Sequence, residues 1–157
     1  MIAEAVGGGG WVAAGLAAAA AFGLVVMRRR YTVITVSGSS MNPTYADGDR
    51  LLVRRASARR ISREQVVVFR MPPGHRQEGL RWLVKRAAAV PGDPVPADMH
   101  AVEGLGALVP PGRLLVRGDN PRSLDSRHFG YVPAGDVLGV AVRPLAVRPL
   151  TGGSRRG

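Results

Sequence analysis

The 157-residue sequence contains no cysteine, which excludes disulfide bonds and thiolate chemistry. Its three histidines, His75, His100 and His128, lack the spacing of metal ligands, so we predict neither a metal nor a cofactor. Acidic residues are scarce, 11 against 22 basic ones, and the formal net charge is +11. This balance suggests anionic lipid or nucleic acid as a neighbour, although a general bias towards arginine explains it equally well. Because there are only eight aromatic residues and no stacking motif, no nucleic-acid partner is expected.

Lysine is the rarest charged residue. Of the 22 basic residues, 21 are arginine and one is lysine, Lys85, inside the apolar run Leu83-Val84-Lys85. An amine loses its proton when it is desolvated, whereas a guanidinium does not. The single lysine therefore suggests a position chosen for proton transfer, with chance survival as the alternative.

An uncharged stretch, residues 7–27, is the candidate membrane span. Twenty-one helical residues would measure about 31 Å, roughly the thickness of one hydrocarbon core. Trp11 near one end and Arg28, Arg29 and Arg30 at the other suit interfacial anchoring. A cleaved signal peptide fits less well because no basic region precedes the apolar run, and a buried helix of a soluble protein is the other alternative.

The remainder of the chain shows short apolar runs separated by glycine and proline turns. This pattern predicts a mostly β fold: a compact antiparallel sheet or barrel-like domain, with one N-terminal transmembrane helix. Residues 94–112 are rich in proline, glycine and alanine, and we expect a connection without a core of its own. The predicted organisation is an anchor with a basic flank over residues 1–30, a catalytic β domain over 31–150 and a disordered tail over 151–157.

Four segments contain the polar residues that catalysis would need. Ser40 lies in a Ser/Gly stretch after an apolar strand, and such a stretch alone is most often an ordinary loop. The lone lysine lies in the third segment, and the fourth contains Asp125-Ser126-Arg127. In chain order, the segments cover residues 38–44, 47–49, 83–93 and 118–127.

In this order, after a single span, the segments resemble the type I signal peptidases (leader peptidases), membrane-bound serine proteases with a Ser/Lys dyad. The resemblance covers roughly residues 31–144. It implies that Ser40 is the nucleophile, that Lys85 is the general base and that Ser123 orients the lysine. It also implies that Asp125 and Arg127 form a structural ion pair near the site. Asp119 and Asn120 would lie in a glycine turn that supports it.

The chemistry supports these roles independently. A serine hydroxyl is a weak nucleophile until a base takes its proton, and an amine is a base only when it is neutral. Its pKa must therefore fall well below the usual value of about 10.4. We expect burial of Lys85 among Leu83, Val84 and Met41 to lower it.

The sequence departs from the family pattern at three positions. Gly38 stands where many members have a serine that helps form the oxyanion hole, so the backbone N–H of Ser40 would contribute more. Two residues separate Asn120 from Ser123, where the usual pattern has three. Tyr45 replaces a usual leucine.

By the same resemblance, the substrates are signal peptides of secretory precursors, cleaved after Ala-x-Ala-like sites. An extended peptide would pair with free strand edges at residues 32–36 and 80–84. Shallow apolar pockets for alanine-sized side chains would form around six residues, although core packing also explains these positions: Ile34, Val36, Met41, Tyr45, Leu51 and Val84.

The resemblance and the charge pattern disagree about topology. A bacterial signal peptidase works on the outer face of the plasma membrane, so we expect a single-pass protein in the lipid bilayer with residues 31–157 outside. The positive-inside rule instead assigns Arg28, Arg29 and Arg30 to the cytoplasm. We follow the resemblance because four motifs carry it.

Two other functions compete with this one. A LexA-type autoprotease also uses a Ser/Lys dyad, but an apolar span stands where its DNA-binding helices would be. A non-catalytic membrane accessory protein of the same fold is the second alternative, and the presence of Ser40, Lys85 and Ser123 argues against it.

Overall fold

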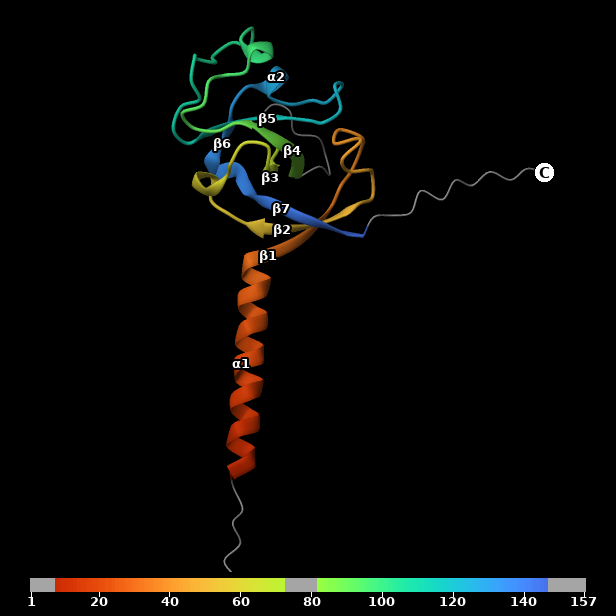
Figure 1. The fold of residues 1–157 in the computed structure, drawn as a ribbon, viewed down its shortest axis with the longest axis vertical. Coiled ribbons are helices and arrows are strands. Elements are labelled where there is room, and N and C mark those ends of the chain that lie inside the picture. The colour runs from red at the N-terminus through yellow and green to blue at the C-terminus, as the bar shows by residue number, and fades with distance from the viewer. Residues whose placement is uncertain (1–7, 73–81, 147–157) are drawn as a thin grey trace, which may run out of the picture.

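The computed structural model describes residues 8–72 and 82–146, and its N-terminal element is the helix α1, Gly8–Arg30. Alanine, the best helix former, dominates its sequence, and three arginines fill its last turn, where positive charge favours the negative end of the helix dipole. Residues Val12–Arg30 have a mean hydropathy of 1.5, and none of that segment is buried against the protein. In Figure 1, α1 projects from the sheet as a separate stalk, long and apolar enough to cross a membrane.

A single antiparallel sheet is the framework of the part that follows α1, and it confirms the predicted mostly β fold with one N-terminal apolar helix. Its strands follow the order β1-β2-β7-β3-β4-β5-β6. β1 continues directly from α1, so that the chain passes from helix to sheet without a linker. The strands are β1 (Tyr31–Thr35), β2 (Arg50–Arg55), β3 (Val66–Arg70), β4 (Trp82–Ala89), β5 (Arg113–Arg117), β6 (Val132–Pro133) and β7 (Val137–Ala146).

Short helices connect the strands. Within the described ranges, one of them is an α-helix, α2 (Ser126–Phe129), which begins in a polar stretch that gave no helix signal in the sequence. Asp125 caps it, because its side chain accepts a hydrogen bond from the backbone N–H of Arg127. The others are the 3₁₀ turns η1 (Ala58–Arg60), η2 (Ala97–Met99) and η3 (Ala134–Asp136).

The two faces of β4 serve different apolar clusters. Successive side chains of a strand point to opposite faces. Leu83 and Ala87 pack in a cluster with Phe69, whereas Val84 packs in a second cluster with Met41.

A third cluster shows that one prediction was wrong. Residues 94–112 were expected to have no core, yet Val95, Met99 and Val109 are buried together with Ala89 and Leu115 of the sheet. Alternating small and apolar residues in an irregular segment carry no periodic signal, so only the tertiary contacts show this packing.

The predicted domain boundaries at residues 30 and 150 remain a prediction. The change from helix to strand falls between Arg30 and Tyr31. The tail predicted at 151–157 lies outside the described residues.

Candidate active site

Lys85 lies in the middle of β4, opposite Val67 of β3, with 2% of its surface exposed. Burial lowers the pKa of its amine from 10.5 to about 8; Asp125 opposes this shift, Arg127 adds to it and Asp119 opposes it. A substantial fraction of the amine is therefore neutral near pH 8, which is the state that a general base needs.

The surroundings of Lys85 differ in part from the expectation. The alternation of β4 puts Lys85 on the same face as Leu83 and Ala87, and Leu83 is one of its three predicted neighbours. Val84 and Met41, the other two predicted neighbours, pack in the cluster of the opposite face. Sequence adjacency suggested Val84 as a neighbour, but adjacent residues of a strand point away from each other.

Ser40 follows β1 in a tight turn and is partly exposed. The backbone N–H of Gly38 donates a 2.8 Å hydrogen bond to Asp47 Oδ1, and Gly38 has a φ of +85°. A φ in this range favours glycine, so a serine at position 38 would be strained here. Further along, the N–H of Tyr45 donates to the carbonyl of Met41 at 2.9 Å and completes the turn.

The turn after β5 lies directly against the Ser40 turn. The backbone N–H of Asn120 donates to the carbonyl of Ser40 at 3.1 Å, and its side-chain amide donates to the carbonyl of Ser39 at 3.1 Å. A Cβ on Gly118 would lie 2.7 Å from the same Ser40 carbonyl and would collide with the side chain of Ser123. Gly118 thus allows these two serines to approach one backbone position.

Ser123, Asp125 and Arg127 form the wall behind that turn. Ser123 is 3% exposed, and its N–H donates to the carbonyl of Asn120 at 3.0 Å. Asp125 is fully buried; it accepts from the N–H of Gly118 at 2.9 Å and from Arg127 Nε and Nη2 at 2.9 and 2.7 Å. Burial acts to raise the pKa of Asp125, but the hydrogen bonds from Arg127 and Gly118 outweigh it and hold the pKa below its usual value. The predicted Asp125–Arg127 ion pair is present in the structure.

Arg86 and Thr44 join this network although sequence reasoning gave neither a role. Asp119 accepts from Arg86 Nε at 2.9 Å, from Arg86 Nη2 at 2.6 Å and from the hydroxyl of Thr44 at 2.5 Å. Arg86 also donates to the carbonyl of Glu64 at 2.8 Å. The hydrogen bonds from Arg86 hold the pKa of Asp119 below its usual range, and those to Asp119 raise the pKa of Arg86. Asp119 therefore connects the strand of Lys85 with the turn of Ser40.

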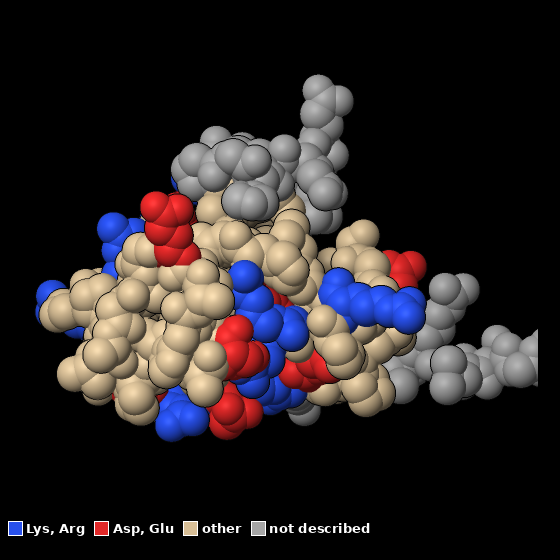
Figure 2. Space-filling view, turned by 90° about the horizontal axis from the view of Figure 1, so that it is seen from above, with Lys and Arg blue, Asp and Glu red and all other residues tan. Residues whose placement is uncertain are grey.

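The pair of Arg86 and Asp119 borders a cavity. Arg86 and Asp119 line a cavity of about 160 Å³ together with Arg63, Glu64 and Arg117. Figure 2 shows the face opposite α1, on which acidic and basic side chains lie next to one another. In residues 8–72 and 82–146, no cluster of three or more histidines and carboxylates is suited to hold a metal ion.

The six residues expected to line substrate pockets belong to one apolar cluster. Ile34 and Tyr45 are partly buried at its rim. The other four are buried, so any pocket here has them as its floor: Val36, Met41, Leu51 and Val84.

Two strand edges lie near this cluster. β1 is the terminal strand of the sheet and pairs with β2. β4 pairs with β5 from Arg86 onwards, so among the described residues the segment 82–85 has no partner on that side. Residues 80 and 81 of the predicted second edge lie outside the described residues.

Comparison with known proteins gives the family. The family model for "Signal peptidase, peptidase S26" matches residues 9–105 and 96–146. The chain belongs to the signal peptidase family. This assignment confirms the resemblance seen in the sequence. It favours a peptidase of a family that cleaves signal peptides over a LexA-type autoprotease.

Bacterial and mitochondrial proteins are among its relatives. The chain is 35% identical over 122 residues to a mitochondrial ATP-independent inner membrane protease subunit 1a of Arabidopsis thaliana, covering 72% of this chain and 70% of the relative. It is 31% identical over 140 residues to signal peptidase I V of Bacillus subtilis, covering 67% and 80%. It is also 33% identical over 110 residues to mitochondrial inner membrane protease subunit 1 of Schizosaccharomyces pombe, covering 67% of each.

Proposed function

We propose that this protein is a membrane-anchored serine endopeptidase that removes signal peptides from exported precursors after Ala-x-Ala-like sites. Ser40 is the nucleophile and Lys85 the general base. The observation that carries the proposal is the state of Lys85: the single lysine of the chain is buried in β4, and its pKa is lowered to about 8. A buried amine without a chemical role would destabilise the fold for no gain.

The proposed reaction has two steps. The neutral amine of Lys85 takes the proton of the Ser40 hydroxyl as its oxygen attacks the scissile carbonyl carbon. The tetrahedral intermediate then breaks the C–N bond, Lys85 returns the proton to the leaving amine, and an ester to Ser40 remains. Water that gives its proton to Lys85 hydrolyses this ester, which releases the signal peptide and restores the hydroxyl.

The neighbouring residues serve this reaction by holding its parts in place. Ser123 orients the amine of Lys85, and Asp125 with Arg127 supports the turn that contains Ser123. The backbone N–H of Ser40 stabilises the oxyanion, since Gly38 has no side chain to do so.

The substrate would bind as an added strand. The β1 edge and the unpaired segment 82–85 of β4 offer backbone groups to an extended peptide. Because the cluster behind them is already filled, only small side chains fit its rim, which agrees with alanine at the sites of cleavage.

One experiment tests the dyad. The full-length protein in detergent micelles is incubated with a precursor that carries one Ala-x-Ala site, and cleavage is followed on gels. Ser40→Ala and Lys85→Arg should each abolish cleavage while the circular dichroism spectrum stays unchanged. Cleavage by folded Lys85→Arg would refute Lys85 as the base, and cleavage by neither variant nor wild type would favour the accessory-protein alternative.

We further propose that α1 anchors the protein and that residues 31–157 lie on the extracytoplasmic side. The helix is long and apolar enough for this role. Protease added to intact spheroplasts should digest the β-rich part. Digestion only after lysis would show the opposite topology, the one that the positive-inside rule favours.

A further inference from the structure

An open hollow of about 470 Å³ lies outside the candidate active site. Its walls come from the loop after β2, from the ends of β3 and β4, and from η3 with the start of β7. The lining residues are Arg55, Ala56, Ser57, Arg70, Trp82, Gly135, Asp136, Val137 and Leu138. Apart from Trp82, whose backbone belongs to the proposed peptide-binding edge of β4, none of them has a role in the proposed reaction.

The strand register puts this hollow at the end of the sheet where α1 enters. Tyr31, the first residue after α1, is opposite Arg54, so Arg55 lies level with the last residue of the helix. Across the neighbouring strands, Arg55 is opposite Gly139, and Arg70 is opposite Trp82. The hollow is therefore formed by four adjacent strands, β2, β7, β3 and β4, at the end nearest α1.

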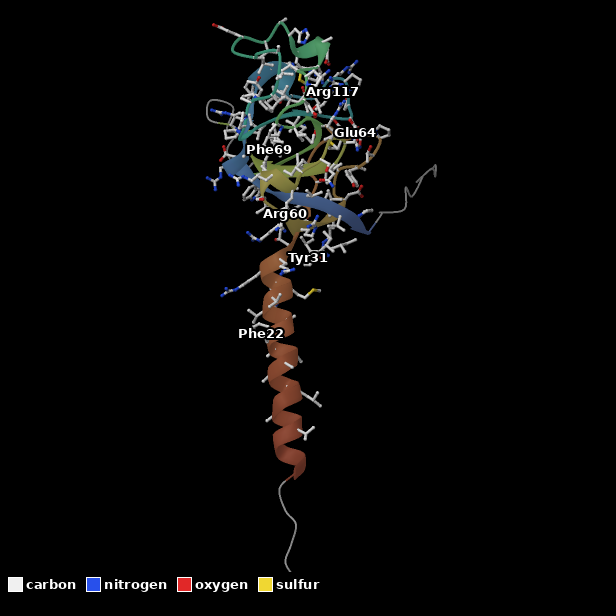
Figure 3. All side chains as sticks on the ribbon, turned by 60° about the vertical axis from the view of Figure 1, so that its left-hand side comes forward. Phe22, Tyr31, Arg60, Glu64, Phe69 and Arg117 are labelled. Atoms are coloured by element: carbon white, nitrogen blue, oxygen red, sulfur yellow. The ribbon has the colours of Figure 1, made fainter. Side chains whose placement is uncertain are left out.

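Arginines dominate this end of the molecule. In Figure 3, Arg60 lies above Tyr31, in the part of the sheet domain towards α1. One carboxylate lines the hollow, Asp136. Eight arginines lie in the last turn of α1, at the end of β2, in η1 and at the end of β3: Arg28, Arg29, Arg30, Arg54, Arg55, Arg59, Arg60 and Arg70.

Four arginines around the candidate active site differ from these arginines because they are paired, although Arg122 of the same region is exposed and has no ion pair among the described residues. Arg63, Arg86, Arg117 and Arg127 each form an ion pair with an aspartate. Among the described residues, the exposed arginines at the α1 end have no carboxylate within ion-pair distance: Arg55, Arg59, Arg60 and Arg70. Unpaired guanidiniums that surround a hollow attract an anion from outside the chain.

We propose that this hollow binds the phosphate headgroup of an anionic phospholipid. Arg55 and Arg70 contact the phosphate, and the hydroxyl of Ser57 offers a further hydrogen bond. The guanidinium of Arg70 lies 5.9 Å from the ring of Trp82, and tryptophan is a residue that favours the membrane interface. The proposal rests on the proposed anchoring by α1, because a spanning helix brings this end of the sheet to the headgroup layer.

The proposal accounts for the arginine cluster whichever side of the membrane the sheet occupies. Arginines that bind headgroups next to a spanning helix are needed on the side where the protein works. If Arg28, Arg29 and Arg30 belong to such a headgroup-binding cluster, they are weaker evidence for a cytoplasmic location than the positive-inside rule assumes.

The experiment measures lipid binding and not cleavage. A protein that binds no lipid can therefore be distinguished from a protein that lacks the proposed peptidase activity. The full-length protein with Trp11→Phe, in which Trp82 is the remaining tryptophan, is kept in micelles of an uncharged detergent. Dioctanoyl phosphatidylglycerol is titrated while tryptophan fluorescence is recorded. Dioctanoyl phosphatidylcholine, inorganic phosphate and glycerol 3-phosphate are titrated in parallel.

We expect a saturable change with phosphatidylglycerol alone, and a midpoint that rises with salt concentration. Arg55→Gln with Arg70→Gln should raise that midpoint about 30-fold, since each basic residue beside an anionic lipid strengthens binding about fivefold. Arg55→Gln alone leaves the Arg70–Trp82 contact intact, and it should raise the midpoint about fivefold.

The matched control removes the same charge elsewhere. Arg63 precedes β3 and Arg113 begins β5, both at the opposite end of these strands from the hollow. Arg63→Gln with Arg113→Gln should leave the midpoint nearly unchanged. The proposal is overturned if this control weakens binding as much as the hollow variants, if phosphatidylcholine binds equally well, or if inorganic phosphate saturates the same signal at the same concentration.

Discussion

The guanidinium of Arg86 holds the carboxylate of Asp119 through two hydrogen bonds, Nε to Oδ1 at 2.9 Å and Nη2 to Oδ2 at 2.6 Å. Arg86 directly follows Lys85 in β4, and Asp119 directly precedes Asn120, whose N–H binds the carbonyl of Ser40. The pair thus fixes the distance between the strand of the proposed base and the turn of the proposed nucleophile. Thr44 adds a third contact from the far end of that turn.

Asp119→Ala should reduce kcat/KM about 100-fold, because a shift of about 1 Å between the reacting groups has an effect of that size. The protein should stay folded, with a loss of about 1–3 kcal/mol in the free energy of unfolding for the broken hydrogen bonds. Precursor cleavage and thermal unfolding of the detergent-solubilised protein measure the two effects.

Asp98→Ala provides the control, since it breaks another short Arg–Asp pair, the one with Arg117. Its side chain is 48% exposed, and exposed ion pairs contribute little, so activity should stay within about twofold. Equal losses in the two variants would show that Asp119 acts only through general stability.

The rate should depend on the protonation of Lys85. Because its pKa is lowered to about 8, kcat/KM should rise with pH through this value and level off above about 9. Initial rates on a short peptide substrate from pH 6 to 10 measure the profile. A rate independent of pH over this range would contradict a lysine base.

Lys85 should also destabilise the folded state at neutral pH. Its pKa is about 8 in the folded protein, against 10.5 for an unperturbed lysine, so the unfolded chain holds the proton more tightly. This contribution is fully unfavourable below about pH 8, and it makes stability rise as the pH increases from about 8 to about 10.5. Lys85→Met should therefore raise the free energy of unfolding at pH 7 by about 3 kcal/mol.

Thermal unfolding of wild type and Lys85→Met at pH 7 and pH 10 measures this difference, which should shrink at the higher pH. Ser40→Ala is the control, since it also removes activity but keeps the lysine. A Lys85→Met protein less stable than wild type at pH 7 would contradict the lowered pKa of the Lys85 amine.

Gly118 should not tolerate a side chain. A Cβ there would collide with Ser123 and approach the Ser40 carbonyl to 2.7 Å, so Gly118→Ala must displace one of these residues. We expect a loss of about 1–3 kcal/mol in stability and a severe loss of cleavage. Gly106→Ala, whose nearest neighbour would be 3.7 Å away, should change neither. A stable, active Gly118→Ala protein would mean that the Ser40 and Gly118 turns are not in close contact.

Several features were predictable because they depend on local patterns. An uncharged alanine-rich run predicts α1, and short β-branched runs between turns predict the strands. The lone lysine and the Ser/Gly stretch stood out by composition and spacing, and the four segments together gave the family. Thr44 and Arg86 escaped prediction because nothing in their spacing shows that both side chains meet Asp119.

The amino-acid sequence alone determined which residue types are available: one amine among guanidiniums, a serine in a glycine turn and an apolar helix next to basic residues. Only the tertiary structure decided how they combine. The strand alternation sends Lys85 to the face of Leu83 and away from Val84, and the register of four strands brings Arg55, Arg70 and Trp82 to one hollow. These relationships arise from pairing between segments far apart in the chain, and such pairing depends on packing across the whole sheet.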